Sequence, residues 1–496
     1  MTDHDMPLVG PILMLDDVDG ATCRLSAIFI ARHPATVPPL SVEGTIHEAE
    51  HLLGFADHAV YRIRFTVPAD RPSSYTWNGE TFDLASDFRA DLRLAFVSCN
   101  GEEHGDLARE GGERNAMWAR LATQHREAPF ALLLHGGDQI YADEATKGHP
   151  LSEHWPDRLP RDPSRADLAS LREHLRERFL ERYLAIYSAP EIAWLLARVP
   201  SLMQWDHHDI CDGWGSLQRS RTYSPVGQVL FAVARETALA LQHGSVEGDL
   251  PARFGDPEGN HLGWCVEAPG LRILAPDLRS ERTRRNIMGP AGWTFVEDVC
   301  AGPPVPQTLL MSSVPLLGPR LSILETLMVM VPTMQKYEDD LRDQWQSRAH
   351  RQEWRRMLGL LRDMVGSTGS EVTTLSGEIH LATQAEMALG EGRMLHQLVA
   401  SGIAHRAPPK AWARALGTIA SLGENPLEGH PIRIKPLPGQ RGRYVAERNA
   451  LMLERGAAGW HARWDLEISG LTEALPLTSG LGGTFSVRMF AFHSPQ

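Results

Sequence analysis

The sequence predicts an α/β protein that contains a parallel β-sheet. Two apolar runs, "LRLAFVSCNG" and "FALLLHGGD", are typical of buried strands, and "ERNAMWARLATQ" between them is typical of a short helix. A strand, a helix and a second strand in this order form a βαβ unit with parallel strands. The second run stops at two glycines and Asp138, at the end of the strand where open α/β sheets bind their ligands.

The two ends of the chain are rich in predicted strands. Within residues 1–90, the segment "SSYTWNGETFDL" alternates around Asn78-Gly79, a typical type I′ hairpin turn, and we expect residues 1–90 to form a small N-terminal β-sandwich-like domain. Residues 91–496 are expected to form the main domain, with a strand-rich part from about residue 431.

Three helices are predicted between these strand-rich regions. Apolar residues at helical spacing predict an amphipathic helix over residues 166–187 and another over 346–365. Between them, "SAPE" predicts a capping box in which Ser188 and Glu191 serve each other's backbone and start a helix that ends before Pro200.

The composition indicates a globular protein without a membrane span. The chain has 496 residues, 43% of them hydrophobic, and its apolar runs are shorter than the roughly 18 residues needed to cross a bilayer. A formal net charge of -13 argues against a general nucleic-acid surface, although a small phosphate ester could bind if metal ions supply positive charge. The acidic N-terminal stretch has no signal peptide or twin-arginine pattern, and the five cysteines are scattered, so we expect a cytoplasmic protein with reduced thiols. These patterns do not define an oligomeric state.

Polar side chains gather in the loops that follow the predicted strands. Thiolate, carboxylate, phenolate and imidazole groups bind metal ions, and the carboxyl ends of parallel strands meet at one edge of a sheet. The pattern therefore predicts a metal centre, in which Asp138 is the candidate to bridge two cations roughly 3.5 to 4 Å apart. Each residue alone also has a structural explanation: a Gly-Gly-Asp segment is often only a turn, and Cys99 would fit as a small buried hydrophobe. The loop residues are Cys99, Asn100, Asp138, Tyr141, Asp206, His207, His208, Asp209, Glu378 and His380.

Six segments occur in an order that is specific to one known family. They are "FVSCNG", "LLLHGGDQIYAD", "MQWDHHDICDGWGS", "LAPDLRSER", "DDLRDQW" and "LSGEIH". Through them, residues 92–405 resemble the PhoD-like alkaline phosphatases and phosphodiesterases of the metallophosphoesterase (calcineurin-like) superfamily. The resemblance implies a four-layer α/β/β/α sandwich, usually preceded by a small β domain, and two or more metal ions, iron and calcium in related proteins. The implied metal ligands are Cys99, Asp138, Tyr141, His207, Glu378 and His380.

The sequence departs from the family pattern at two of these ligand positions. His207 replaces an acid, and Glu378 replaces an aspartate. A neutral imidazole removes one negative charge and favours a softer metal than calcium, so manganese, zinc and iron all stay open. The longer carboxylate of glutamate can still bind a metal, with a changed geometry.

Two residues are candidates for contact with the substrate, Asn100 and Arg279. The segment "DLRSER" could hold a phosphate through the guanidinium of Arg279. A structural salt bridge from this arginine to Asp277 or Glu281 is the alternative.

The resulting hypothesis is a metal-dependent phosphoric ester hydrolase, acting on small monoesters, diesters or both. A metal-bound hydroxide would attack phosphorus, with His208 and Asp209 as the catalytic residues and His208 protonating the leaving alkoxide. The alternative is a degenerate family member that acts as a binding or regulatory module, motivated by His207 and Glu378. A serine hydrolase is disfavoured because the sequence contains no G-x-S-x-G elbow.

Overall fold

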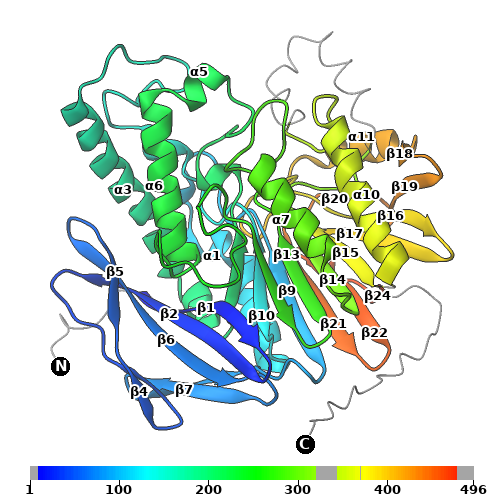
Figure 1. Ribbon diagram of the computed structural model, residues 1–496, viewed down its shortest axis with the longest axis horizontal. Coiled ribbons are helices and arrows are strands. Elements are labelled where there is room, and N and C mark those ends of the chain that lie inside the picture. Colours follow the sequence, from blue (N-terminus) through cyan, green and yellow to red (C-terminus); the bar gives the residue numbers. More distant parts are fainter. Residues whose placement is uncertain (1–8, 320–342, 369, 478–496) are drawn as a thin grey trace, which may run out of the picture.

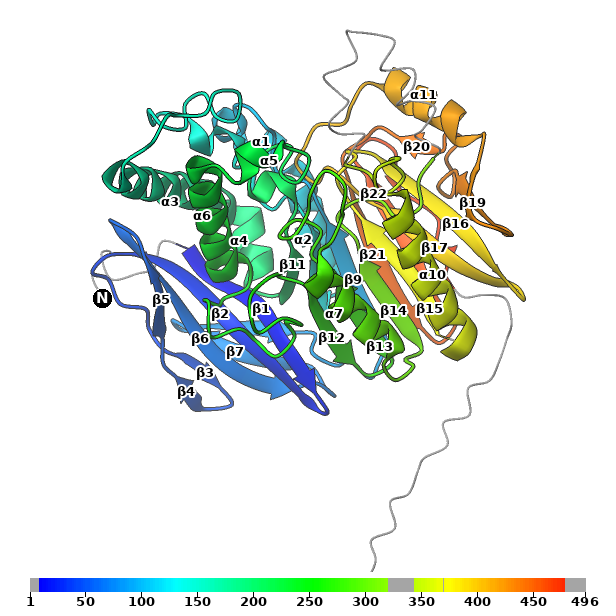
Figure 2. The same cartoon turned by 45° about the horizontal axis from the view of Figure 1, so that its top comes forward.

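Two large β-sheets face each other, and helices cover their outer faces (Figure 1). The computed structural model describes residues 9–319, 343–368 and 370–477. In Figure 2, helices α7 and α10 lie across one of the sheets, whereas α3, α4 and α6 lie on the other side of the molecule.

The strands form three sheets within these described ranges. The first has eleven strands in the order β23 (Gly470–Leu471), β22 (Gly459–Leu466), β21 (Asn449–Gly456), β9 (Leu92–Val97), β10 (Leu132–Gly136), β11 (Ser201–Gln204), β1 (Val9–Asp19), β2 (Thr22–Arg32), β6 (His58–Pro68) and β5 (Glu50–Gly54), with β24 (Leu475–Pro476) beside β22. The second has nine strands in the order β12 (Trp264–Ala268), β13 (Leu271–Ala275), β14 (Gln307–Met311), β15 (Glu371–Ser376), β17 (Arg393–Val399), β16 (Ala382–Gly390), β19 (His430–Lys435) and β18 (Glu424–Leu427), with β20 (Tyr444–Val445) beside β16. The third has four strands in the order β4 (Thr45–His47), β3 (Leu40–Val42), β7 (Ser73–Trp77) and β8 (Glu80–Leu84).

Helices connect and cover these sheets. The α-helices are α1 (Gly111–Arg114), α2 (Ala116–Glu127), α3 (Arg165–Tyr187), α4 (Pro190–Leu196), α5 (Arg219–Thr222), α6 (Pro225–Gln242), α7 (Pro290–Ala301), α10 (Arg351–Thr368) and α11 (Lys410–Ala420). Short 3-10 helices are η1 (Asp106–Ala108), η2 (Asp143–Thr146) and η3 (His207–Asp209).

Alternating side chains of the second sheet show that it packs on both of its faces. Ile273 and Leu309 belong to the core that this sheet shares with the first sheet. Their neighbours Leu274 and Leu310 belong to a second core, which includes Trp354 of α10. Because successive residues of a strand point to opposite faces, this sheet lies between the first sheet and a helical layer. The α/β sandwich predicted from the sequence is confirmed.

The predicted βαβ unit is formed by β9, α2 and β10. Leu94 pairs with Leu132 in parallel register, and β10 continues in parallel to β11 through Leu133 and Ser201. The carboxyl ends of all three strands therefore lie at the same edge of the sheet.

The N-terminal region is built from strands, and part of it continues the first large sheet. Strand β1 pairs in parallel with β11 at Met14 and Ser201, so β1, β2, β6 and β5 extend that sheet. Asn78 and Gly79 have φ angles of 47° and 81° and join β7 to β8, which confirms the hairpin turn. A domain boundary near residue 90 stays a prediction.

The helix over residues 166–187 is confirmed by α3, but the capping box predicted to follow it is wrong. Helix α3 runs to Tyr187, so Ser188 caps its C-terminus and donates its Oγ hydrogen bond to Leu184 O at 2.6 Å. Helix α4 begins with Ala189 as its N-cap, and no side chain caps that end. Ser188 therefore ends helix α3 and does not serve as the N-cap of α4 that the motif requires.

Helix α10 begins five residues later than the predicted 346–365 helix, at Arg351. Turns precede it, in which His350 Nδ1 lies 3.2 Å from Gln344 O and 3.1 Å from Ser347 Oγ. The strand-rich tail is present from β19 to β24, and its predicted continuation beyond residue 477 lies outside the described residues.

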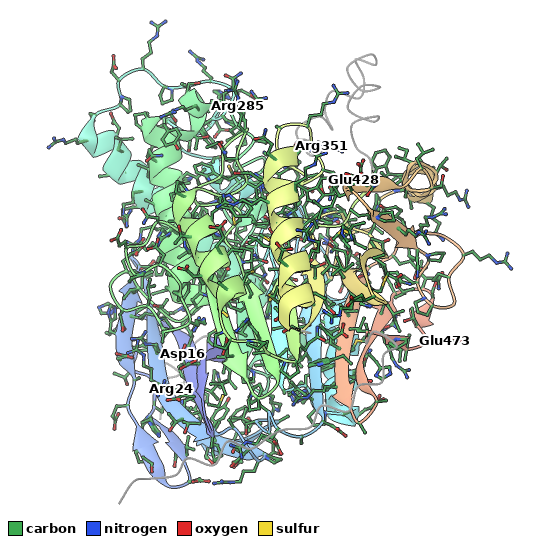
Figure 3. All side chains as sticks on the ribbon, turned by 45° about the vertical axis from the view of Figure 1, so that its right-hand side comes forward. Asp16, Arg24, Arg285, Arg351, Glu428 and Glu473 are labelled. Atoms are coloured by element: carbon green, nitrogen blue, oxygen red, sulfur yellow. The ribbon has the colours of Figure 1, made fainter. Side chains whose placement is uncertain are left out.

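Side chains fill the space between the layers, and charged groups project at the periphery (Figure 3). Arg285 and Glu428 are examples of such exposed side chains.

We predict that shortening a side chain in the core between the sheets will destabilise the protein strongly. Leu309 is fully buried there, so Leu309→Ala should lower the free energy of unfolding by about 2–5 kcal/mol. The same change at Leu422, which is 65% exposed, should cost less than about 0.5 kcal/mol. Denaturant unfolding of both variants measures the difference, and equal stabilities would contradict this packing.

Candidate metal centre

Loops from both large sheets meet at one edge of the molecule. Cys99 follows β9, Asp138 follows β10 and His207 follows β11, whereas Glu378 and His380 follow β15 of the second sheet. Segments far apart in the sequence are thus brought together by the topology of the strands.

Backbone hydrogen bonds tie these loops to one another. The Cys99 amide donates to Gly137 O at 3.1 Å, which joins the loops after β9 and β10. A third loop, which follows β17, is held by the amides of Ile403 and His405, which donate to Ser98 O at 3.0 Å and to Cys99 O at 3.1 Å.

The two glycines before Asp138 are required by neighbouring protein atoms. A Cβ at Gly136 would overlap the ring of Phe96. Gly137 has a φ of 107°, and a Cβ there would lie 2.6 Å from Cβ of Asp206. Glycine at these two positions therefore lets the β10 loop approach Phe96 of β9 and the loop after β11 closely.

Four of the predicted ligands adopt a backbone conformation that non-glycine residues rarely take. The φ angles of Cys99, Asp138, Glu378 and His380 are 56°, 55°, 65° and 53°. Such a conformation costs on the order of 1–3 kcal/mol per residue and persists only where the surroundings enforce it. Clusters of such residues are typical of functional sites, which supports a role for these side chains in binding.

Asp138, His207 and His208 form a buried group whose potential ligand atoms all lie within 4.8 Å of one another. Sγ of Cys99 lies 3.5 Å from Oδ2 of Asp138. The ring of Tyr141 stacks on that of His208, with centroids 4.2 Å apart. Five side chains that the sequence singled out are thus neighbours.

Burial disfavours the charged forms of the acidic groups in this cluster. It raises the pKa of the Cys99 thiol and of the Tyr141 phenol well above their ordinary values, and the Asp138 carboxylate raises both further. Burial also raises the pKa of Asp138 itself. A cation would relieve this mutual repulsion, because metal binding stabilises the deprotonated thiolate, phenolate and carboxylate.

Tyr141 gives a direct test of whether these residues fit a metal. Its hydroxyl oxygen is buried and has no hydrogen-bond partner among the residues that the structure describes. A buried polar atom without a partner is costly, so its position needs an explanation. The donor set of thiol, carboxyl, phenol and imidazole fits a transition metal such as iron, zinc or manganese.

Glu378 and His380 differ in their surroundings from the other predicted ligands. Both carboxylate oxygens of Glu378 accept from Gln344 Nε2, at 2.8 and 2.6 Å, and burial followed by the nearby Asp343 raises its pKa to about 8. His380 is grouped with Glu103 and His405, two residues that the sequence analysis did not select.

His208 is held by a carboxylate that sequence reasoning missed. Its Nδ1 lies 3.0 Å from both oxygens of Asp143. Burial lowers the pKa of His208, but the charge and hydrogen bond of Asp143 together with the charge of Asp138 raise it overall to about 9. Asp143 stands five residues after Asp138 in the same conspicuous segment, which is the signal that could have identified it.

Asp209 accepts hydrogen bonds from the backbone of two loops. Its oxygens accept from the backbone amides of Asp138 at 2.9 Å, Gln139 at 2.9 Å, Ile140 at 3.1 Å and Asp206 at 2.8 Å. This fully buried carboxylate therefore positions the two loops, and its catalytic role stays a prediction.

Arg279 also has partners within the protein, and its contact with a substrate stays a prediction. Its Nε donates to Asp206, its Nη1 donates to Trp214 O at 3.1 Å, and its Nη2 lies 2.6 Å from Oδ2 of Asp343. Arg279 does form structural salt bridges, as the alternative expected, but its partners are Asp206 and Asp343 instead of Asp277 or Glu281. Asp343 belongs to "DDLRDQW", whose first four residues lie outside the described residues.

Asn100 also has structural partners within the protein. Its Oδ1 accepts from Trp118 Nε1 at 2.8 Å, and its Nδ2 donates to Gln139 O at 3.4 Å. Because it is buried and its amide is bonded on both sides, it helps to join the β9 and β10 loops, and its contact with a substrate stays a prediction.

Comparison with solved structures identifies the class of fold. The structure of PhoD superposes with a TM-score of 0.57 at 12% sequence identity, and the aligned region covers 97% of this chain and 94% of the PhoD chain. The structure of a purple acid phosphatase from yellow lupin (Lupinus luteus) seeds superposes with a TM-score of 0.50 at 11% identity, and the aligned region covers 94% of this chain and 73% of the lupin chain. The chain therefore has the α/β sandwich fold of these phosphatases.

The sequence itself matches the model of one family, described as PhoD related phosphatase, over residues 89–338. The chain belongs to this family, as its sequence segments indicated. An uncharacterized protein of Saccharomyces cerevisiae is 26% identical in an alignment of 432 residues that covers 69% of this chain. The match spans 60% of the length of that yeast protein.

Within the described part of the chain, none of the helices combines the length and apolarity that spanning a lipid bilayer requires.

We predict that Asp209→Ala will destabilise the fold, because it leaves buried backbone amides without an acceptor. Each unsatisfied group costs about 1–3 kcal/mol, so the free energy of unfolding should fall by at least about 3 kcal/mol. Asp212→Ala, which removes an exposed carboxylate from the same loop, is the control and should change it by less than about 0.5 kcal/mol. If both variants unfold like the wild type in thermal denaturation, Asp209 does not have this positioning role.

Proposed function

We propose that this protein is a metal-dependent hydrolase of phosphoric esters. Its family and the fold it shares with phosphatases support this reaction class. The observation that carries the proposal is the buried cluster in which Cys99, Asp138, Tyr141 and His207 offer donors that fit metal ions, with His208 beside them as the candidate proton donor.

Cations would give this acidic site the positive charge that a phosphate ester needs. When bound, they would polarise the phosphoryl oxygens and lower the pKa of a water molecule toward neutrality. Asp138 lies within reach of both Cys99 and the histidine pair, so its carboxylate is the candidate bridge between cations. Arg279 holds Asp206 and Asp343 in place through ion pairs.

His208 is the candidate proton donor to the leaving group. Asp143 holds its Nδ1, which fixes the ring and keeps the imidazole protonated at neutral pH. The Nε2 atom is then the one that can give a proton to the leaving alkoxide. Asp143 acts through His208 and is a positioning residue.

We predict that His208→Ala will slow the hydrolysis of alkyl phosphate esters by about 10²–10⁴-fold. The phenolate of an aryl ester such as p-nitrophenyl phosphate leaves without taking up a proton. The hydrolysis of aryl esters should therefore slow much less. Steady-state rates on both kinds of ester measure this, with His461→Ala on β22 as the control. An equal loss on both kinds of ester would contradict the proton-donor role.

We also predict that activity depends on bound metal. Removing metal with a chelator should abolish turnover of aryl phosphate monoesters and diesters, and adding Mn²⁺, Zn²⁺ or Fe²⁺ should restore it. Cys99→Ala should lower the metal content found by elemental analysis, since the thiolate is a proposed ligand. A metal-free protein that still hydrolyses these esters would refute the proposal, and a folded, metal-loaded protein that hydrolyses none of them would count against it.

Glu378 supports a second candidate, a binding or regulatory module without catalysis. Its carboxylate is occupied by Gln344 and belongs to neither ligand group of the described residues. Restoring the family's acids with His207→Asp and Glu378→Asp distinguishes the two candidates. Activity that appears only in the restored protein would favour the second.

A further inference from the structure

A groove lies at the end of the second sheet that is formed by β18 and β19. It has a volume of about 760 Å³ and is bounded by these two strands, the C-terminal end of α11 and the first residue of α10. In Figure 1, α11, β18 and β19 lie together on the opposite side of the molecule from α3 and α6. None of the residues that bound the groove within the described ranges is a predicted metal ligand, so it is separate from the candidate metal centre.

The side chains around this groove are mainly cationic, in contrast to the chain as a whole. The whole chain has 49 lysines and arginines against 62 aspartates and glutamates. Among the described residues that bound the groove, Glu424 is the only acid. A local reversal of charge of this kind raises the concentration of anions near the groove. The cationic residues are Arg351, Arg433, Lys435 and Arg443.

Acidic side chains of the protein neutralise some of these cations but not Arg433. Nη2 of Arg351 lies 3.0 Å from Oε1 of Glu424, and Lys435 forms an ion pair with Glu386. The side chain of Arg433 is exposed and forms no ion pair with any residue that the structure describes. Its charge is therefore available to a ligand.

Arg443 is held in place so that one nitrogen of its guanidinium stays free. Its Nε donates to Ile434 O at 3.1 Å and its Nη1 donates to Gly417 O at 3.4 Å, which joins β19 to α11. Its Nη2 makes no hydrogen bond within the described part of the chain. A guanidinium fixed in this way loses little conformational entropy when an anion binds to the free nitrogen.

Two helix ends reach the groove with opposite partial charges. The N-terminal end of α10, at Arg351, is positive, and the C-terminal end of α11, at Ala420, is negative. Because these partial charges offset each other, the cationic side chains determine the sign of the groove.

We propose that this groove binds a small molecule that carries two or more phosphate groups. Guanidinium groups match the oxygens of a phosphate, and the volume lies within the roughly 300–1,000 Å³ of small-molecule sites. Arg433 and Lys435 stand two residues apart on one face of β19, about 7 Å along the strand, so a ligand with more than one anionic group suits them best. The net charge of -13 disfavours an extended nucleic acid.

Isothermal titration calorimetry of the full chain with methylenediphosphonate tests the proposal. This compound carries two phosphonate groups, and its carbon bridge is not an ester, so a phosphoric ester hydrolase does not consume it. Arg433→Ala should weaken binding about 10-fold or more, because a charge-assisted hydrogen bond is lost, and Arg433→Glu should weaken it further. Arg441→Ala, which removes an exposed arginine outside the groove, is the matched control and should bind like the wild type.

A second arm distinguishes a free molecule from a lipid headgroup as the source of the phosphate groups. The wild type and Arg433→Glu are sedimented with vesicles of phosphatidylcholine, with and without phosphatidylinositol bisphosphate. Sedimentation of the wild type alone with the bisphosphate vesicles supports the proposal with a lipid headgroup as the ligand. Binding of the diphosphonate without sedimentation supports it with a free molecule as the ligand.

Equal behaviour of the wild type, Arg433→Ala and Arg433→Glu in both arms would overturn the proposal. Tighter binding of a hexaglutamate peptide than of the diphosphonate would also overturn it, since the groove would then be a site for an acidic peptide. The inference does not rest on the proposed hydrolysis. Any diphosphonate bound at the metal centre is common to all of these proteins, and the Arg433 variants should keep whatever esterase activity the wild type has, so the two failures are distinguishable.

Discussion

The repulsion among buried acidic groups is the constraint on which the site depends. Cys99, Asp138 and Tyr141 are enclosed together, and each makes deprotonation of the others less favourable. A protein without an ion to hold would gain stability by replacing such a cluster with apolar side chains. The cluster, together with a Tyr141 oxygen that has no hydrogen-bond partner in the described part of the chain, is explained most simply by bound cations.

The surrounding structure holds the predicted ligands in place. Asp209 accepts from backbone amides of the two loops that carry Asp138 and His207, and Arg279 joins Asp206 to Asp343. These buried contacts support the unusual backbone angles of the predicted ligands. Asp209 and Arg279, which the sequence marked as site candidates, thus also stabilise the loops around the site.

The architecture and the strand-end positions of Cys99 and Asp138 could be predicted, because apolar runs that stop at glycine and polar residues are local patterns. The contacts of Asp209 and Arg279 could not be predicted in the same way. Their partners come from other loops, and only the fold shows that their hydrogen-bonding capacity is already used. His405 was missed because no pattern marks a single histidine in a loop. The capping box predicted at Ser188 was wrong for a related reason. Helix α3 extends to Tyr187, so Ser188 ends that helix instead of starting the next one.

The two sheets meet at this site only through their loops, and each contributes ligands to it. Cys99 and Asp138 come from one sheet, and His380 comes from the other. An ion bound by side chains from both would act as a cross-link between the halves of the sandwich, comparable in effect to a covalent tie. Metal supply would then govern how long the folded chain survives heat or proteases, quite apart from any reaction it performs.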